Sequence, residues 1–253
     1  MNPKRPKFVS ISSQKGGIGK STLTVIACSF LHYEYGYNVA IIDCDECQAS
    51  ISKMRERDKE INTSTPEKIK LLKSYFTKLG KKSYPIIRSN LADAMQSAEK
   101  LIKESAMPFD FVFFDFPGSV GPKHMLPNIA SLDHVFSPIT ADIFTLESTL
   151  SFARLLIGHV IHTRDHRLKS IHLFWNFVDN REKSYLYEVY DEYLQKEGIP
   201  VMKVFLPKRV RYTREQSFND GLFFRSTYFT PDKSYLADSN IELFIKELLQ
   251  IIK

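Results

Sequence analysis

Long hydrophobic runs are missing from this 253-residue sequence, and no stretch approaches the roughly 18 apolar residues that a membrane-spanning helix requires. Cysteine is scarce: Cys28, Cys44 and Cys47 favour a reducing cytoplasm over a disulfide-stabilised secreted scaffold. Cys44 and Cys47 have no second cysteine pair with which to form a zinc site, and the seven histidines show no metal-ligand spacing. The sequence therefore argues against a membrane-spanning protein, a secreted disulfide scaffold and a zinc protein.

Internal repeats, low-complexity tracts and linkers are also absent, so we expect one domain over residues 1–253. Apolar residues make up 43% of the chain and charged residues 25%, which is ordinary for a soluble globular protein. The formal net charge of +6 modestly favours polyanionic partners without identifying one. The basic N-terminus leads at once into a strand, so we do not expect a signal peptide.

Apolar strand patterns alternate with amphipathic helix patterns along the chain. Strands are predicted at residues 8–11, 38–43, 85–87, 109–114, 133–139, 171–178 and 201–206. Helices are predicted at residues 21–35, 66–78, 91–106, 142–163, 182–196 and 237–253. This order predicts an α/β fold of three layers, in which a mostly parallel twisted sheet carries helices on both faces.

A glycine-rich segment, residues 12–22, separates the first predicted strand from the first predicted helix. In that context glycines let backbone N–H groups close around phosphate oxygens, and the helix N-terminus adds a favourable dipole. We expect Lys20 to reach the β- and γ-phosphates of a nucleotide and the Ser21 hydroxyl to bind Mg²⁺. The other nucleotide-binding residues expected in this loop are Lys15, Gly16, Gly17, Ile18, Gly19 and Thr22.

The loop departs from the plain phosphate-binding pattern, because Gln14 occupies the first glycine position and Lys15 follows it. Its K-G-G-x-G-K-[ST] sequence resembles the deviant Walker A motif of the ParA/MinD family of ATPases. The resemblance implies a P-loop NTPase fold, ATP and Mg²⁺ as cofactors, and an ATP-dependent homodimer in which Lys15 reaches the partner's nucleotide. It spans roughly residues 7–253 and is weakest over residues 52–108, where no family motif occurs.

Aspartates end two of the predicted strands, at the sheet edge where ligands of such folds bind. Asp115 closes the strand of residues 109–114, where it is placed to hold Mg²⁺ through water, as a Walker B residue does. Residues 43–48 resemble the family's first switch, although they lack its proline and have one extra residue before Gln48. That resemblance implies that Asp43 lies near the metal and that Asp45 orients or deprotonates the attacking water.

Residues 115–118 resemble the second switch of the family, with Gly118 in place of the usual last residue. We expect this glycine to make the loop more mobile. The catalytic residues expected from the motifs are Lys15, Lys20 and Asp45, and the expected metal-site residues are Ser21, Asp43 and Asp115.

Two weaker signals concern the nucleotide base and DNA. The resemblance implies that Asn176 and Pro207 contact the base, although a structural asparagine and a turn proline are open alternatives. A basic run without acidic residues suits non-specific contact with DNA phosphates, although solvated surface charge is an alternative. The expected DNA-binding residues are Lys203, Lys208, Arg209, Arg211 and Arg214.

The function expected from these motifs is an ATP-dependent dimerising switch that hydrolyses ATP to ADP and phosphate with weak basal activity. By resemblance it would bind DNA non-specifically, respond to a stimulating partner protein, and serve the partition or positioning of a plasmid or mobile element. No helix-turn-helix pattern precedes the loop, so we do not expect sequence-specific DNA reading.

Two alternatives stay open. One is a positioning ATPase that acts on a protein complex or a membrane surface without DNA, and the other is an ATP-dependent metabolic enzyme on the same scaffold. Membrane binding is not expected, because the polar face of the last helix mixes acidic and basic residues and suits docking on the core.

Overall fold

A computed structural model describes residues 5–118, 122–161, 166–179, 184–209 and 224–253. Within these residues one sheet of six parallel strands has the order β3-β2-β4-β1-β5-β6. The strands are β1 (Lys7–Ile11), β2 (Val39–Asp43), β3 (Ile86–Arg88), β4 (Phe111–Asp115), β5 (His134–Ile139) and β6 (Ser170–Trp175). The predicted three-layer α/β fold with a parallel sheet is confirmed.

All six strands except β3 are largely buried on both sides, and their side chains alternate between two hydrophobic clusters. In β1, Phe8 belongs to one cluster, whereas Val9 and Ile11 belong to the other. The first cluster is completed by α4 (Ala94–Glu104), α5 (Pro122–Ala130), α6 (Ile143–Leu156) and α7 (Ser184–Lys196). The second is completed by α1 (Lys20–Ser29), α2 (Ser50–Asn62), α8 (Lys233–Leu236) and α9 (Ile241–Ile252).

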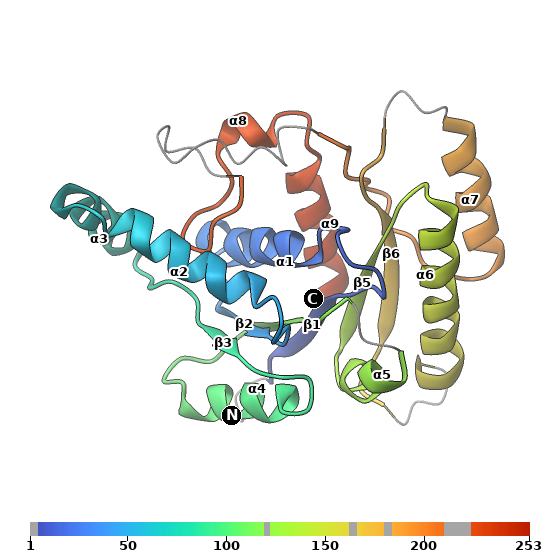
Figure 1. Cartoon of the computed structure of the whole chain (residues 1–253), viewed down its shortest axis with the longest axis horizontal. Coiled ribbons are helices and arrows are strands. Elements are labelled where there is room, and N and C mark those ends of the chain that lie inside the picture. The colour runs from blue at the N-terminus through green and yellow to red at the C-terminus, as the bar shows by residue number, and fades with distance from the viewer. Residues whose placement is uncertain (1–4, 119–121, 162–165, 180–183, 210–223) are drawn as a thin grey trace.

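Helix α3 (Pro66–Leu79) has no buried residue and extends from the body of the molecule at the left of Figure 1. Its aromatic side chains Tyr75 and Phe76 contact the body near Tyr33. No helix of the described residues is long and apolar enough to cross a membrane. The last helix, α9, buries Ile241, Phe244, Ile245, Leu248 and Ile252, so its expected docking on the core is confirmed.

Two predicted helices continue as π-helical turns: α1 into Phe30–Glu34 and α6 into Ile157–Ile161. Three other helices were not predicted: α2, α5 and the four-residue α8. In α2 only Ile51, Ser52, Met54 and Asp58 are buried, so the helix shows little apolar periodicity. In α5 the internal Pro127 is an unfavourable helix residue that hides the pattern.

The predicted strand at residues 201–206 forms only two isolated bridges near its ends, Leu173 with Val201 and Val178 with Pro207. The prediction of a regular strand is therefore wrong. Glu247 on α9 explains the interruption, because its carboxylate accepts hydrogen bonds from the backbone N–H groups of Lys203 and Val204, at 2.8 and 2.9 Å. These two donors are directed to a side chain and away from β6.

Candidate nucleotide-binding site

The glycine-rich loop joins the carboxyl end of β1 to the start of α1, as predicted. Gly17 and Gly19 adopt φ values of 76° and 85°, a left-handed conformation that residues with a Cβ rarely adopt. Gly19 is the N-cap of α1, and no side chain caps this helix and no acidic residue lies in its first turn. No acidic residue of the first turn therefore offsets the positive end of the α1 dipole, which suits an anion.

Lys20 places an amine inside this loop. Its side chain is buried, and Nζ donates to the carbonyl oxygen of Lys15 at 2.8 Å. Burial lowers the pKa of Lys20, while the nearby carboxylates of Asp115 and Asp45 act to raise it. Incoming phosphate oxygens would give this buried amine an anionic partner in place of a carbonyl.

Gly118, in the predicted second switch, packs directly against the loop. A Cβ built on it would lie 2.6 Å from Lys20 Nζ, 3.0 Å from the Lys15 carbonyl oxygen and 3.1 Å from the Gly16 nitrogen. The close approach of two backbone segments therefore accounts for a glycine at this position, for which the sequence suggested only mobility. That expected mobility stays a prediction.

Ser21, Asp43 and Asp115 lie together, as predicted. Asp43 and Asp115 are register partners at the ends of β2 and β4. Ser21 Oγ donates to Asp115 Oδ2 at 2.6 Å. Burial raises the pKa of Asp115 to about 7, although the hydrogen bond from Ser21 acts in the opposite direction.

The free oxygens of this cluster fit a divalent cation. Asp43 Oδ1 and Asp115 Oδ1 are buried and have no hydrogen-bond partner among the described residues. Carboxylate and hydroxyl oxygens are the ligands that Mg²⁺ prefers, directly or through water. The second oxygen of Asp43 has a structural role, because Oδ2 accepts hydrogen bonds from Ser52 N and Oγ at 2.8 and 2.6 Å and so fixes the start of α2.

Nine of the predicted site residues line one cavity of about 610 Å³. They are Gly16, Gly17, Gly19, Lys20, Ser21, Thr22, Asp45, Asn176 and Pro207. Asp45 is half-buried at the cavity wall, where its Oδ1 accepts a hydrogen bond from Gln48 N at 3.0 Å. Ile18 does not line the cavity, and its carbonyl oxygen instead accepts a hydrogen bond from Asn176.

Lys15 points away from the cavity that its neighbours form. Its Nζ lies 3.0 Å from Asp142 Oδ1, and the two side chains are 46% and 52% exposed. An ion pair this exposed contributes at most about 1 kcal/mol, so the amine exchanges partners at little cost.

Asn176 follows β6 and contacts the loop. Its Nδ2 donates to the Ile18 carbonyl oxygen at 2.9 Å, and its Oδ1 accepts from Phe177 N at 2.9 Å. These bonds give the residue a positioning role, and its predicted contact with the base stays a prediction.

Phe177 is a cavity residue that the sequence analysis missed. It is 39% exposed and has a φ of 57°, which is strained for a large side chain. Strain of this kind is common at ligand sites, but the residue follows no motif that would have revealed it.

Arg225 was also missed. Its Nη1 donates to Thr22 Oγ1 at 3.0 Å across 203 positions of sequence, and it lines the cavity. The following residues are fixed by the buried Asp58 of α2, which accepts hydrogen bonds from Thr227 N at 2.6 Å and from Ser226 Oγ at 3.1 Å. No sequence signal links these residues, because only the fold brings them together.

The predicted DNA-binding run is described only in part. Lys203 and Lys208 are exposed, whereas Arg209 is half-buried and donates to the Asp238 carbonyl oxygen at 3.3 Å. Arg211 and Arg214 lie outside the described residues. The structure therefore leaves this DNA interface a prediction.

Residues 9–222 match the family model described as the CobQ/CobB/MinD/ParA nucleotide binding domain. The chain belongs to this family. The expected ParA/MinD membership is confirmed, and the matched region, described as a nucleotide binding domain, includes the glycine-rich loop. No curated protein sequence matches the chain.

Solved structures of several family members resemble the fold. A plasmid partition protein from Borrelia burgdorferi bound to AMPPNP is 20% identical, with a TM-score of 0.59 over 98% of this chain and 100% of that chain. Cobyrinic acid a,c-diamide synthase from Mycobacterium smegmatis, with an ATP analogue and magnesium, is 18% identical, with a TM-score of 0.61 over 97% and 94%. The cell division protein MinD from Aquifex aeolicus is 16% identical, with a TM-score of 0.60 over 96% and 97%.

Proposed function

We propose that this protein is an ATP-dependent dimerising switch that hydrolyses ATP to ADP and phosphate, binds DNA non-specifically, and serves the partition or positioning of a plasmid or mobile element. The observation that carries the proposal is the pair of loop lysines. Lys20 lies buried inside its own loop, whereas Lys15 is directed outward to Asp142. The two lysines of one loop thus point in different directions, which supports a site shared between two copies.

In this proposal ATP occupies the 610 Å³ cavity. Its phosphates accept hydrogen bonds from the loop amides and Lys20, and Phe177, Leu206 and Pro207 offer apolar surface to the base. Mg²⁺, held at Ser21 and through water at Asp43 and Asp115, would neutralise charge on the phosphates. Asp45 lies on the cavity wall, where it would orient the attacking water.

Phosphoryl transfer depends mainly on positioning and on charge stabilisation. The partner's Lys15 would add a second ammonium to the phosphates, which accumulate negative charge as the bond to the leaving oxygen breaks. In the single chain this amine is held by Asp142, so dimerisation would exchange one anionic partner for another. Hydrolysis would remove the phosphate that the partner's lysine contacts and release the dimer.

The test is size-exclusion chromatography with light scattering on protein loaded with ATP, with ADP or with no nucleotide. ATP is expected to give a dimer, and Lys15→Ala is expected to keep ATP binding but to lose both dimerisation and hydrolysis. Asp142→Asn is the matched control, because it breaks the same ion pair while leaving the lysine in place, and it should still dimerise. A wild-type protein that stays monomeric with ATP would overturn the proposal.

A second candidate, an ATP-dependent synthetase, is favoured by the likeness to the diamide synthase. Slow ATPase activity without any small substrate, together with DNA binding that strengthens with ATP and weakens with salt, supports the switch. ATP turnover that occurs only when a carboxylic acid substrate is added supports the synthetase.

A further inference from the structure

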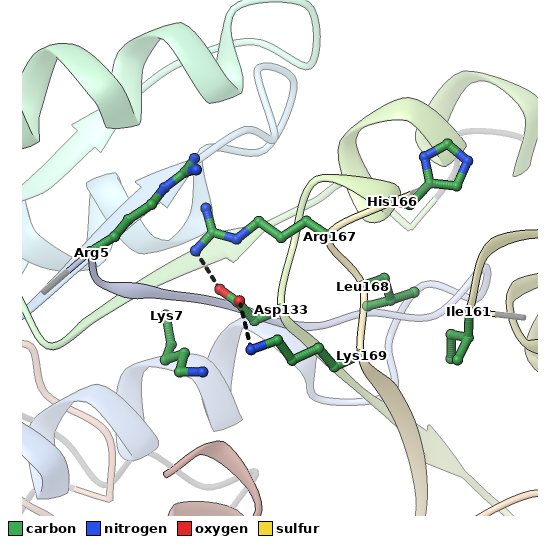
Figure 2. Close-up of a pocket in the computed structure, with 8 residues that line it drawn as sticks. All are labelled: Arg5, Lys7, Asp133, Ile161, His166, Arg167, Leu168 and Lys169. Carbon is green, nitrogen blue, oxygen red and sulfur yellow. Dashed lines mark hydrogen bonds and ion pairs between the residues drawn. The ribbon is translucent and has the colours of Figure 1, made fainter. Parts of the chain in front are cut away.

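The edge of the sheet opposite the glycine-rich loop carries an open groove of about 750 Å³. Its lining comes from the N-terminal segment, the residue before β5, the π-helical turn after α6 and the segment leading into β6 (Figure 2). Four lysine and arginine side chains line it, whereas Asp133 is the one carboxylate among its lining residues. The lining residues are Arg5, Lys7, Asp133, Ile161, His166, Arg167, Leu168 and Lys169, and we call this set the basic groove.

Asp133 is already engaged by the fold. Its Oδ2 accepts hydrogen bonds from Phe8 N at 2.7 Å and from Arg167 Nη2, and its Oδ1 lies 3.9 Å from Lys169 Nζ. Burial acts to raise the pKa of Asp133, but the Arg167 and Phe8 hydrogen bonds outweigh it and hold that pKa below its usual value. Among the described lining residues four cations outnumber one ionised carboxylate, so this lining has an excess of positive charge.

Arg167 is fixed in the groove before any ligand arrives. Its Nη2 also donates to the Pro6 carbonyl oxygen at 2.8 Å, and its guanidinium lies 4.1 Å from the centre of the Phe8 ring. The Arg5 guanidinium lies 5.4 Å from the centre of the same ring, so two like charges gather at one aromatic side chain. Arg167 Nη1 is buried and has no hydrogen-bond partner among the described residues. An anion at this place would relieve the repulsion and accept the unused donors.

We propose that the basic groove binds the phosphodiester backbone of nucleic acid, independently of the nucleotide state. Guanidinium and ammonium groups are the usual partners of backbone phosphates, and the groove is open, so a chain can run through it. Among its described lining residues only Ile161 and Leu168 are apolar, and none is a Phe, Tyr or Trp on which a base could stack. The groove is therefore suited to charge and not to base sequence.

This inference extends the DNA-binding part of the proposed function, and its biological meaning rests on that proposed function. The two differ in what they require. The proposed switch would gain affinity for DNA with ATP, through a different surface, whereas the basic groove lies at the far edge of the sheet and binds DNA without nucleotide.

The test is fluorescence anisotropy with labelled double-stranded DNA of random sequence, without nucleotide, across a series of salt concentrations. The double variant Arg5→Ala/Lys169→Ala is expected to bind roughly tenfold more weakly at low salt and to lower the salt slope by about 2. Lys100→Ala/Lys103→Ala, which removes the same charge from two exposed positions on α4, is the matched control and should bind like wild type. Lys169→Arg keeps the charge and should also bind like wild type.

Thermal melting of each variant shows whether it is folded. Wild-type protein that does not bind DNA without nucleotide, or a groove variant that binds DNA as well as the α4 control does, would overturn the inference. Equal displacement of DNA by polyglutamate of matched charge would also overturn it, in favour of an acidic protein partner. A missing ATP-dependent gain in DNA affinity, with the groove effect intact, would count against the proposed switch alone.

Discussion

The two edges of the sheet present positive charge in different forms. We call the side of the sheet at the carboxyl ends of the strands the carboxyl edge, and the side at their amino ends the opposite edge. At the carboxyl edge the loop uses left-handed glycines, the start of α1 and one buried lysine, and at Gly118 there is no room for a methyl group. At the opposite edge the charge lies on long side chains, and Lys169 is 57% exposed. In these proposals the carboxyl edge selects its ligand by shape, whereas the opposite edge attracts its ligand by charge density. A single substitution should therefore damage the first edge severely and the second only in part.

The sharpest contrast is expected from Lys20→Ala. The buried amine contributes a charge-assisted contact to phosphate, and its loss should weaken ATP binding by at least about 100-fold, as measured by calorimetry. DNA binding without nucleotide should be unchanged. Lys169→Ala is the reciprocal variant: it should weaken DNA binding and leave ATP affinity as it is. Equal loss of both activities in either variant would remove the distinction between the two edges.

Gly118→Ala tests the claim that shape governs the carboxyl edge. The added methyl group would meet two backbone atoms as well as Lys20 Nζ, so the loop must shift. We expect a loss of about 2–3 kcal/mol in the free energy of unfolding without nucleotide, measured by urea denaturation. Gly158→Ala is the control, because a Cβ there would contact nothing within 4 Å, and its stability should be unchanged or slightly increased. A stable Gly118→Ala protein would show that the loop is not tightly packed.

The contrast between the edges also explains what the sequence could reveal. The glycine-rich loop and the strand-end aspartates are local patterns with a fixed structural context, so the fold and nine of the cavity residues could be predicted. Arg225 could not, because its partner Thr22 lies 203 positions away and only the packing of α2 on the C-terminal segment joins them. The basic groove was missed for the same reason, since residues near 5, 133 and 167 meet only in the folded sheet.

His134, the first residue of β5, tests the positive charge at the groove edge. Its pKa is lowered to about 4, mainly by burial; Asp133 acts to raise it, whereas Lys7 and Lys169 add to the lowering. The unfolded chain takes up the proton near pH 6.5, so the stability from neutral His134 is present above that pH and is lost as the pH falls towards 4. Between pH 7 and 5 this loss is about 2 kcal/mol.

Between pH 7 and 5 the free energy of unfolding of His134→Gln should therefore fall by about 2 kcal/mol less than that of wild type. Urea denaturation at both pH values measures this difference. His166→Gln is the control, because that side chain is exposed, and it should follow wild type. A His134→Gln protein with the wild-type pH dependence would show that this histidine is not held neutral by its surroundings.

The smallest effect is expected at Arg225, where the shape-governed edge also uses a side-chain charge. Arg225→Gln should weaken ATP binding about fivefold, close to 1 kcal/mol, because the cavity loses one positive charge and the bond to Thr22. Arg225→Lys keeps the charge without the planar donor group, so its ATP affinity should lie between those of Arg225→Gln and wild type. Arg209→Gln is the matched control, because Arg209 does not line the cavity and should leave ATP affinity unchanged. If Arg225→Gln binds ATP like wild type, the guanidinium only anchors the C-terminal segment to Thr22, and the carboxyl edge binds its anion with loop amides and Lys20 alone.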